Sequence, residues 1–493
     1  MKAKTIIIIG GGISGLSAGI YARKSGFRTI VIEAQNNPGG NCTGWSRKGY
    51  FFEGSMHWLN GSSMASPMHR LWLETKALNE ESLITNKDPF LSCDYEDKRI
   101  NAFRNVDLFE AHLLEQSPQD KQHINELCDL IRHFKKLHPP IPDVFGVKMR
   151  NRGPSLIKQV PSLMPFLLRM PFLNRITVKE YAKRFKDPAI RLLLCHVVRS
   201  DYDMFSFFYI ISCFMSNDGG YVEGGSIRMI KNMAQYYSEL GGELKCGLKV
   251  EKISSDGGTG GKVRGVIANG ELIPGEAVIL AFDLQNAADD FFDFPLRESW
   301  MDRLWKKTGL IINTFIGLGI RTDLSSIPEA MVFPVAPFEY GGARIENLLM
   351  YNYAGVAGYA PPGCSAVTIR IQSDSYDYWK EMKDKGLYNL RKEELFMTIL
   401  GRLEEKYPSI RGKTEVWDIA TPLTYERYCG SWRGCWMTVP LPGRKTYNLK
   451  SRNLRGLYFA GHRMMPPGGM PPALMTGRRA VQYLCRDFHV PFG

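Results

Sequence analysis

The chain has 493 residues, of which 44% are hydrophobic, 12% aromatic and 23% charged. These fractions exclude a disordered tail, a collagen-like rod and a coiled coil, and the length favours two domains that interleave along the chain. Lysine and arginine total 63 against 50 acidic residues, giving a net charge of +13. Such an excess suits nucleic acid, an acidic membrane surface or an anionic ligand.

The ten cysteines are irregularly spaced without a C-x-x-C pair, which predicts reduced thiols and a cytoplasmic location. Residues 1–9 imitate a secretory signal, but Gly10 ends the apolar run, so the segment is interpreted as a buried strand. The longest charge-free apolar stretch, 204–217, has 14 residues. A bilayer requires roughly 20, so no transmembrane helix is predicted.

A nucleotide-binding motif follows the first predicted strand. Residues 10–15 fit G-x-G-x-x-G, a helix with small residues on one face follows, and a second strand at 29–32 ends at Glu33. The glycines permit a tight turn and close approach to a pyrophosphate, which the helix N-terminus attracts. Glu33 can accept hydrogen bonds from a ribose and would repel a 2′-phosphate, which argues against NADP. The overlapping G-x-S-x-G at 15–19 is rejected as a hydrolase elbow because its serine would lie inside the helix.

Further glycine-rich segments accompany this motif and carry a family resemblance. The E-x-x-x-x-P-G-G element at 33–40, a late strand at 456–461, and G-G-M-P-P-A-L-M-T-G-R-R-A at 468–480 resemble the FAD-dependent phytoene desaturase, carotenoid isomerase and retinol saturase family. The segment G-S-M-H-W-L-N-G at 54–61 is closer to the retinol saturase-like branch, and G-G-Y-V-E-G-G at 219–225 is also similar to the family. The resemblance covers both ends of the chain and, more loosely, its middle.

The resemblance implies FAD as the cofactor, with its pyrophosphate on the first glycine motif, its ribose on Glu33 and its ring near the start of the last helix, at about 473–487. The helix N-terminus would stabilise the anionic reduced flavin. Asn41 departs from the family, which often has arginine there, so Arg47 or Lys48 would have to substitute. The residues implied to bind the cofactor are Gly10, Gly12, Ile13, Ser14, Gly15, Glu33, Ala34, Gly40, Asn41, Cys42, His57, Val250, Gly461, His462, Met470 and Pro471.

The implied activity is oxidation, reduction or flavin-dependent isomerisation at C–C or C=C bonds of a hydrophobic isoprenoid, carotenoid or related lipid. An amine oxidase-like enzyme acting on a C–N bond, a saturase of fatty acyl lipids and a flavin-containing membrane-bound scaffold are the alternatives. His57 and Glu53 are the candidate acid/base residues, although His57 suits a packing role equally well. Tyr425 and Tyr428 suit either a pocket wall or the core. No metal site is predicted, because histidines and cysteines are scattered.

Much of the positive charge is concentrated in residues 132–179, where ten basic residues face only Asp143. The apolar, proline-punctuated run 156–173 is interleaved with them. Basic residues around an apolar segment predict peripheral contact with a membrane surface, from which a hydrophobic substrate could be drawn; a solvated basic face is the alternative. No nucleic-acid partner is predicted, because no recognition helix or aromatic RNA-binding signature is present.

The predicted fold class is α/β, with a discontinuous Rossmann-like FAD-binding domain and an inserted mixed α+β substrate domain. Helix-like periodicity marks residues 110–137, 178–198, 226–240 and 392–407; strand-like alternation marks 310–320 and 366–371; and Asn269-Gly270 indicates a hairpin. The predicted FAD-binding domain comprises 1–75, 216–290 and 436–493, and the substrate domain comprises 76–215 and 291–435.

Overall fold

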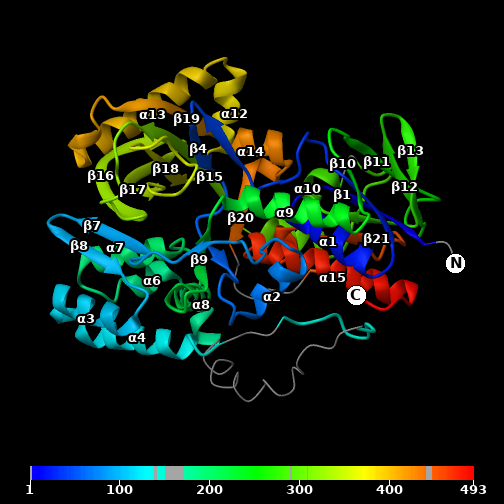
Figure 1. The fold of residues 1–493 in the computed structure, drawn as a ribbon, viewed down its shortest axis with the longest axis horizontal. Helices are drawn as coiled ribbons and strands as arrows, with labels where there is room; N and C mark the ends of the chain where they lie inside the picture. The colour runs from blue at the N-terminus through cyan, green and yellow to red at the C-terminus, as the bar shows by residue number, and fades with distance from the viewer. Residues whose placement is uncertain (1–2, 138–140, 150–170, 289–290, 308, 440–446) are drawn as a thin grey trace.

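The computed structural model describes residues 3–137, 141–149, 171–288, 291–307, 309–439 and 447–493. Its elements form two lobes (Figure 1): one contains a parallel sheet with helices packed against it, and the other contains a large, mostly antiparallel sheet beside a group of helices. This arrangement confirms the predicted α/β class with a Rossmann-like sheet.

The parallel sheet of the first lobe has five strands in the order β10-β2-β1-β14-β21. Its central strand, β1, reads T-I-I-I-I and pairs on both sides with parallel neighbours, which explains why it lacks a polar alternation. The strands come from distant parts of the chain, and the register joins Ile8 to Val31 and Ile279. The strand bounds are β1 Thr5–Ile9, β2 Arg28–Ile32, β10 Glu243–Lys245, β14 Ala277–Leu280 and β21 Leu457–Phe459.

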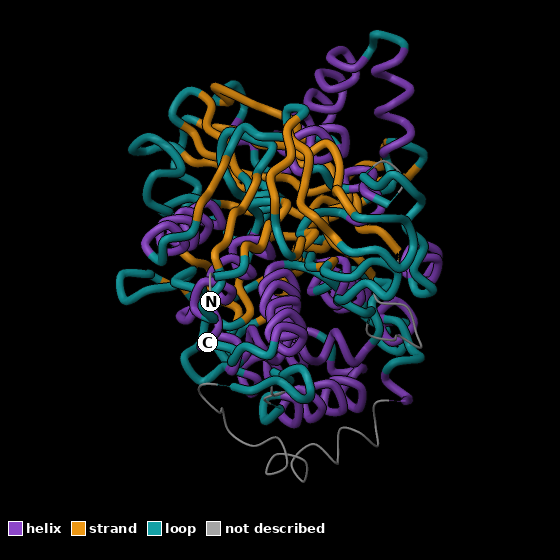
Figure 2. The backbone as a smooth tube through the Cα atoms, turned by 90° about the vertical axis from the view of Figure 1, so that its right-hand side faces the viewer, coloured by secondary structure: helices purple, strands orange, loops and turns teal. Residues whose placement is uncertain are grey.

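Three helices form one neighbouring group in this lobe: α1 (Ile13–Lys24), α9 (Gly225–Glu239) and α15 (Met470–Phe488). The C-terminal end lies beside α1, where the Gly493 amide donates to the Ser25 hydroxyl at 3.1 Å. The Lys4 ammonium, just before β1, lies 3.9 Å from the centroid of the Phe488 ring on α15. Figure 2 shows both ends of the chain in the same region of the molecule. Helix α15 begins three residues before the predicted 473. Its two prolines occupy the first turn, where missing N–H groups cost no intrahelical hydrogen bond.

A small antiparallel sheet adjoins the parallel one and contains the predicted hairpin. Its strands are β11 (Val250–Ser255), β12 (Val263–Ala268) and β13 (Glu271–Pro274). Asn269 and Gly270 join β12 to β13 with φ angles of 51° and 74°. Two consecutive positive φ angles are characteristic of the tight turn that an Asn-Gly pair favours, so this prediction is confirmed.

The second lobe is built on an eight-stranded sheet in which β15 pairs with β18, β19 and β20. Alternate residues of its strands divide between two faces. Ile316 and Ile369 pack into the core beside α12 and α13, whereas Phe315 and Arg370 belong to the opposite face. The strand bounds are β7 Leu91–Tyr95, β8 Lys98–Ala102, β15 Gly309–Ile320, β16 Ala330–Tyr340, β17 Ala343–Asn352, β18 Ser365–Gln372, β19 Thr414–Ala420 and β20 Cys435–Val439.

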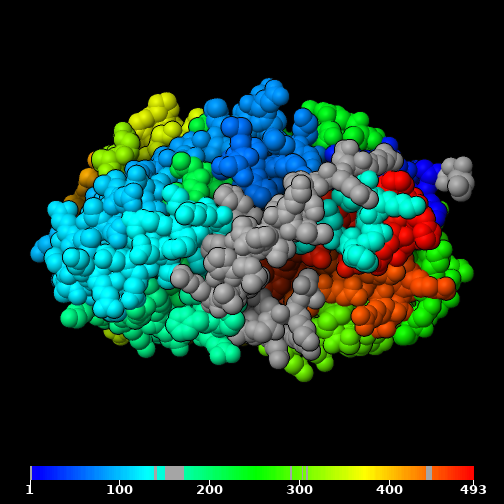
Figure 3. Space-filling view, turned by 90° about the horizontal axis from the view of Figure 1, so that it is seen from below, coloured from blue at the N-terminus to red at the C-terminus, as the bar shows by residue number. Residues whose placement is uncertain are grey.

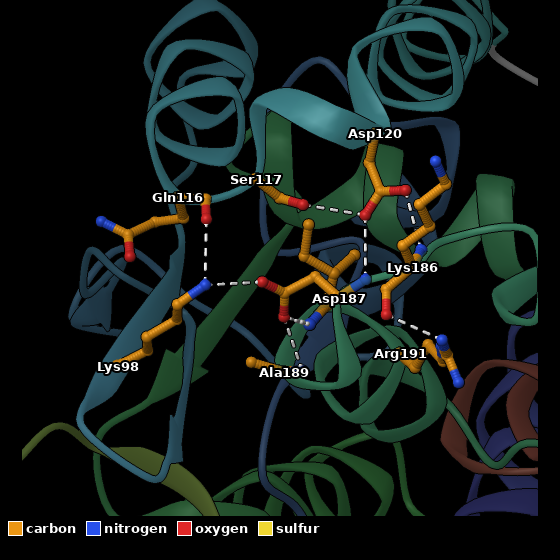
Figure 4. A network of polar contacts seen from close by, with 9 residues as sticks. Lys98, Gln116, Ser117, Asp120, Lys186, Asp187, Ala189 and Arg191 are labelled. Carbon is orange, nitrogen blue, oxygen red and sulfur yellow. Dashed lines mark hydrogen bonds and ion pairs between the residues drawn. The ribbon is translucent and has the colours of Figure 1, made fainter.

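The helical part of the second lobe differs from the two long helices that periodicity predicts. The chain instead breaks at Ser117-Pro118 and at Asp187-Pro188, giving α3 and α4 in the first stretch and α6 and α7 in the second. Figure 4 shows how these breaks are held together: Asp120 accepts from the amides of Lys186 and Asp187 at 2.7 and 3.0 Å. The helix bounds are α3 Val106–Gln116, α4 Lys121–Phe134, α6 Val178–Ala182, α7 Pro188–Val197 and α8 Met204–Met215.

The remaining elements join the lobes or pack around the two main sheets. Among helices of the described ranges, none is both long and apolar enough to cross a bilayer. The apolar stretch at 204–217 instead forms α8, which packs in the helical core. The bounds are β3 Gly44–Arg47, β4 Tyr50–Glu53, β5 Leu59–Asn60, β6 Ile84–Thr85, β9 Gly219–Val222, α2 Pro67–Glu74, α10 Leu284–Ala287, α11 Met301–Lys307, α12 Tyr376–Asp384, α13 Tyr388–Lys406 and α14 Pro422–Cys429.

The segment 141–149 crosses from the helical lobe to the C-terminal helix. Seen from below in Figure 3, its cyan residues lie against the red α15. The Val144 amide donates to Gln482 at 3.0 Å, and Arg478 pairs with Asp143 at 2.5 Å. Residues 150–170, which hold most of the apolar basic run noted in the sequence, lie outside the described residues.

Candidate functional site

A cavity of about 1170 Å³ opens at the carboxyl ends of the parallel strands and extends toward the large sheet. This edge is where open α/β sheets bind ligands. Of the residues implied to bind a cofactor, Gly15 is outside the cavity wall. The others line it: Gly10, Gly12, Ile13, Ser14, Glu33, Ala34, Gly40, Asn41, Cys42, His57, Val250, Gly461, His462, Met470 and Pro471.

The glycine motif presents backbone donors to this cavity. Gly12 is the N-cap of α1, no side chain caps the helix, and its first turn carries no acidic residue. The first-turn N–H groups and the positive end of the helix dipole therefore suit an anion. Gly15 contributes packing: a Cβ there would lie 1.8 Å from the Gly10 carbonyl oxygen. The Gly39 amide donates to the Gly11 carbonyl at 3.1 Å, which fixes the second glycine pair beside the first.

Glu33 lies at the end of β2, beside the glycine turn. Its carboxylate accepts from the amides of Gly11 at 2.7 Å and Gln35 at 2.9 Å, which orients it at the cavity wall. The Leu248 amide donates to the Glu33 carbonyl at 3.0 Å and brings Val250 to the same wall. A carboxylate and a nearby backbone are the groups that a ribose and an adenine require.

A second helix N-terminus faces the same cavity. Gly469 is the N-cap of α15 without a side-chain cap, and Met470, Pro471 and the nearby Gly461 line the wall. Two uncapped helix ends and a carboxylate around one elongated cavity fit a dinucleotide with an attached ring. Across the described part of the chain, no group of three or more histidine, cysteine or acidic residues is arranged to hold a metal ion.

The part of the cavity beside the large sheet is aromatic. The His57 ring stacks on Tyr351 with centroids 3.7 Å apart and an interplanar angle of 2°. Its Nδ1 lies 3.0 Å from the Tyr353 hydroxyl, and Phe315 and Trp436 stand about it at centroid distances of 6.0 and 6.3 Å. Burial, with a smaller contribution from the Arg370 charge, lowers the pKa of His57 well below its usual 6.5, so the ring is neutral at pH 7.

Glu53 lies behind the cavity wall rather than on it. Its oxygens accept from the amides of Ser55 and Met56, both at 3.0 Å, and from the amide and hydroxyl of Ser226 at 3.2 and 2.8 Å. Ser226 is in the first turn of α9, so the carboxylate ties this helix to the β4 turn. Gly225 makes the approach possible, because a Cβ there would lie 2.1 Å from Glu53 Oε2.

This buried carboxyl predicts a pH-dependent stability. Burial raises the pKa of Glu53 from 4.5 to about 7 despite these hydrogen bonds. Because the folded state binds the proton more tightly than the unfolded state, its contribution is complete below pH 4.5 and is lost as the pH rises to about 7. In urea titrations, the unfolding free energy of wild type minus that of Glu53→Gln should fall by about 3 kcal/mol across this window. Parallel pH profiles for the two proteins would contradict the assignment.

The remaining candidates are neutral groups on the wall. Burial, aided by Glu53, raises the pKa of the Cys42 thiol to about 12, so it is no nucleophile at pH 7. Burial lowers the pKa of His462 to about 4. The Asn41 amide donates to the Cys435 carbonyl at 3.2 Å. Of the two tyrosines noted, Tyr428 lines the cavity, whereas Tyr425 is in the core and donates to the Gly54 carbonyl at 2.5 Å.

Sequence reasoning missed three residues of this site. Arg370, from β18, lines the cavity, and Tyr351, from β17, stacks on His57. Asp283, which follows β14, also lines the cavity and forms a buried ion pair with Arg463 at 2.7 Å. The alternation of these strands indicates which residues share a face, but it does not indicate which face covers a cavity. Asp283 had a local signal, since an acidic residue just after a buried strand commonly caps the following helix, here α10.

Comparisons with known proteins identify the family of the chain. The flavin-containing amine oxidoreductase family matches residues 13–485. A phytoene desaturase (lycopene-forming) from Paracoccus sp. is 20% identical over 98% of each chain. An all-trans-retinol 13,14-reductase from Danio rerio is 22% identical over 87% of this chain and 76% of its own. Among solved structures, a putrescine oxidase triple mutant with redesigned cofactor binding has a TM-score of 0.63 at 16% identity, covering 98% of this chain and 99% of its own.

The family match spans nearly the whole chain, and the two uncapped helix ends, the glycine turn and Glu33 fit the cofactor of that family. The solved structure, at its low identity, supports the fold alone. The chain therefore belongs to the flavin-containing amine oxidoreductases and is an FAD-dependent oxidoreductase.

Proposed function

We propose that the enzyme adds, removes or rearranges hydrogen at carbon–carbon bonds of a long apolar isoprenoid. The observation that carries this proposal is the aromatic end of the cavity, which His57, Trp58, Tyr209 and Trp436 line. Such walls suit a polyene, which is recognised by shape and apolar contact. The phytoene desaturase and retinol reductase among the relatives act on substrates of this kind.

We propose that FAD lies along the residues that line the cavity, with its pyrophosphate at Gly12 and its ribose at Glu33. The flavin, when bound, supplies the acceptor or donor of hydride. The protein's own contribution is to hold the substrate against the ring and to exclude water. The neutral thiol of Cys42 and the neutral imidazole of His462 keep this part of the wall free of side-chain charge.

Amine oxidation is the alternative that the family name raises. An alkylamine is a cation at neutral pH, and the nearest cavity-lining charge to the aromatic end is itself cationic, the Arg370 guanidinium over Tyr351. Like charges disfavour such a substrate. Three of the four acidic residues that line the large cavity are bonded to other groups: Glu33 to the glycine turn, Asp283 to Arg463 and Glu426 to the Tyr376 hydroxyl. The fourth, Glu251, is an exposed residue of β11.

The test separates the two chemistries. Oxidised enzyme is mixed without oxygen with phytoene or putrescine, and dithionite-reduced enzyme with all-trans-retinol, while flavin absorbance and product mass are followed. A loss or gain of two hydrogens on a polyene supports the proposal, as does an unchanged mass with a shifted polyene spectrum. Flavin bleaching by putrescine, with no reaction of either polyene, would refute it.

We further propose that His57 handles a proton at the reacting carbon. Burial raises the pKa of Tyr353 well above 10, so this hydroxyl keeps its hydrogen and can donate it to His57 Nδ1. Nε2 then carries the single N–H of the neutral ring, and it lacks a hydrogen-bond partner among the described residues. A neutral imidazole held by stacking and one hydrogen bond is a pre-oriented proton donor or acceptor.

His57→Gln is expected to lower kcat by about 100-fold with flavin content unchanged, because a positioned proton-transfer group contributes that much. Stopped-flow measurement of flavin reduction or reoxidation by the polyene gives the rate. His133→Gln is the matched control, since His133 is exposed on α4 and bonds only its own helix. A wild-type rate for His57→Gln would assign His57 to packing.

We also propose peripheral contact with a membrane. Phe145 is 95% exposed and Phe172 66% exposed, and the neighbouring Lys148, Arg175 and Lys179 are exposed as well. Exposed phenylalanines with nearby lysine or arginine favour an anionic lipid surface. Not all the basic residues contribute, because Arg132 is paired with Asp107, Glu110 and Asp129.

The double change Phe145→Ser and Phe172→Ser should at least halve flotation with phosphatidylglycerol vesicles, because the apolar contact is lost. Replacing Lys148 and Arg175 by glutamine should weaken flotation in low salt and have less effect in high salt. Exchanging Met64, another 88% exposed residue, for serine is the control. Unchanged flotation of both multiple variants would contradict membrane contact.

A further inference from the structure

A second, smaller cavity of about 130 Å³ adjoins the large one. The two share part of one wall, which includes His57, Trp436 and Arg370. The small cavity lies among the large sheet, α8 and the β9 strand, beyond the aromatic end. Its size suits the end group of a molecule whose body occupies the large cavity.

One residue of the wall between the cavities is charged. Arg370 is in β18, and its guanidinium lies 5.3 Å from the Tyr351 ring centroid and 5.7 Å from that of Trp436. Two rings on one guanidinium fix the plane in which its N–H groups point. Its Nε is buried and has no hydrogen-bond partner among the described residues.

The other charges around the small cavity are already compensated. Arg104 donates to the carbonyls of Lys87, Phe214 and Gly219 at 2.7, 2.8 and 3.1 Å. Arg199 forms a bidentate pair with Asp201. Glu329 is the acidic residue on this wall, and burial raises its pKa against the opposing influence of Lys87 and Arg104. Arg104 is therefore satisfied by carbonyls and Arg199 by Asp201, whereas Arg370 is the arginine of this wall whose buried Nε has no hydrogen-bond partner among the described residues.

We propose that the small cavity receives a carboxylate at the end of the apolar substrate and that Arg370 binds it. A planar guanidinium matches a carboxylate in two parallel hydrogen bonds, which supply both affinity and register. The body of the molecule then extends past His57 into the aromatic part of the large cavity. This inference rests on the proposed function and deepens it: the substrate is an acid with a long apolar chain rather than a hydrocarbon.

The test measures binding to the oxidised holoenzyme, without turnover. All-trans-retinoic acid and its methyl ester are titrated while flavin absorbance and tryptophan fluorescence are followed, and oleic acid and methyl oleate form a parallel pair. The free acid should bind at least about 10-fold more tightly than its ester, since a hydrogen-bonded charge pair contributes this much. The larger difference in affinity between acid and ester, in the retinoid pair or in the oleate pair, shows whether the carboxylate is carried by an isoprenoid or by a fatty acyl chain.

Arg370→Met should bring the affinity for the acid down to that for the ester while leaving the ester unchanged, and Arg370→Lys should restore part of the difference. Arg344→Gln is the matched control, because it removes a cation from the same sheet at a surface ion pair with Glu346. Equal wild-type affinities for acid and ester would overturn the inference, whether or not the variants fold. If the enzyme nevertheless turned over hydrocarbon polyenes, the proposed function would still hold. If it oxidised only amines, the proposed function and the carboxylate inference would both be wrong.

Discussion

Gly12→Ala is expected to give a folded protein that purifies without flavin. A Cβ at Gly12 would have the Gly39 carbonyl oxygen, 3.6 Å away, as its nearest neighbour, which is an ordinary contact. The φ angle of −76° is also one that alanine adopts freely. The protein therefore accommodates the methyl group, which enters the space before the α1 N-terminus where the pyrophosphate is proposed to lie. FAD affinity should fall by at least 10-fold, as close approach of the backbone is lost.

The ratio of flavin to protein absorbance and an FAD titration of the apoprotein measure this effect. Gly401→Ala is the control, since no atom lies within 4 Å of the Cβ position at this α13 glycine. Gly15→Ala provides a contrast: its Cβ would lie 1.8 Å from a backbone oxygen, so this variant should fail to fold. Full flavin content in Gly12→Ala would contradict the proposal that the pyrophosphate lies at the α1 N-terminus.

The part of the cavity around the glycine turn was predictable because it is local in sequence. One strand, one glycine turn and one helix place Gly10, Gly12 and Glu33 within a single supersecondary unit, and the physical role of each follows from its position. The C-terminal helix was predictable for the same reason, apart from its start. There, Pro471 and Pro472 belong to the first turn of the helix, although a proline is usually read as its boundary.

The aromatic end of the cavity was not predictable because it depends on contacts between distant segments. His57 stacks on Tyr351, which is almost 300 residues further along the chain, and His57 also meets Trp436 from a third segment. No local pattern distinguishes a strand face that covers a cavity from one that covers a core. One predicted helix ends early because Asp187 caps a new helix, α7, that begins at Pro188. The sequence contains this signal, an acidic residue before a proline, but the apolar periodicity continues across it and favoured one long helix.

Arg463→Met is expected to cost about 3–5 kcal/mol of unfolding free energy, because it leaves a buried carboxylate without its counterion. Asp283 and Arg463 side chains are each 7% exposed, and one guanidinium nitrogen lies 2.7 and 2.8 Å from the two carboxylate oxygens. Burial alone would raise the pKa of Asp283, but the Arg463 charge holds it below its usual range. The ion pair therefore stabilises the fold above the unfolded pKa of Asp283, about 3.9, and loses its effect as the pH falls.

Urea titration of the apoprotein measures this cost without the added stability that bound FAD supplies. The double change Asp283→Asn and Arg463→Met should cost less than the sum of the single changes, since removing both charges leaves no unpaired ion. Arg344→Gln breaks a pair whose side chains are 62% and 58% exposed, and should cost under about 1 kcal/mol. If Arg463→Met lowered the unfolding free energy as little as Arg344→Gln, we would conclude that the ion pair does not hold the end of β14 to the end of β21. The cavity floor would then depend on the Asp283 contacts with the amides of Trp432 and Gln285, at 2.9 and 3.1 Å.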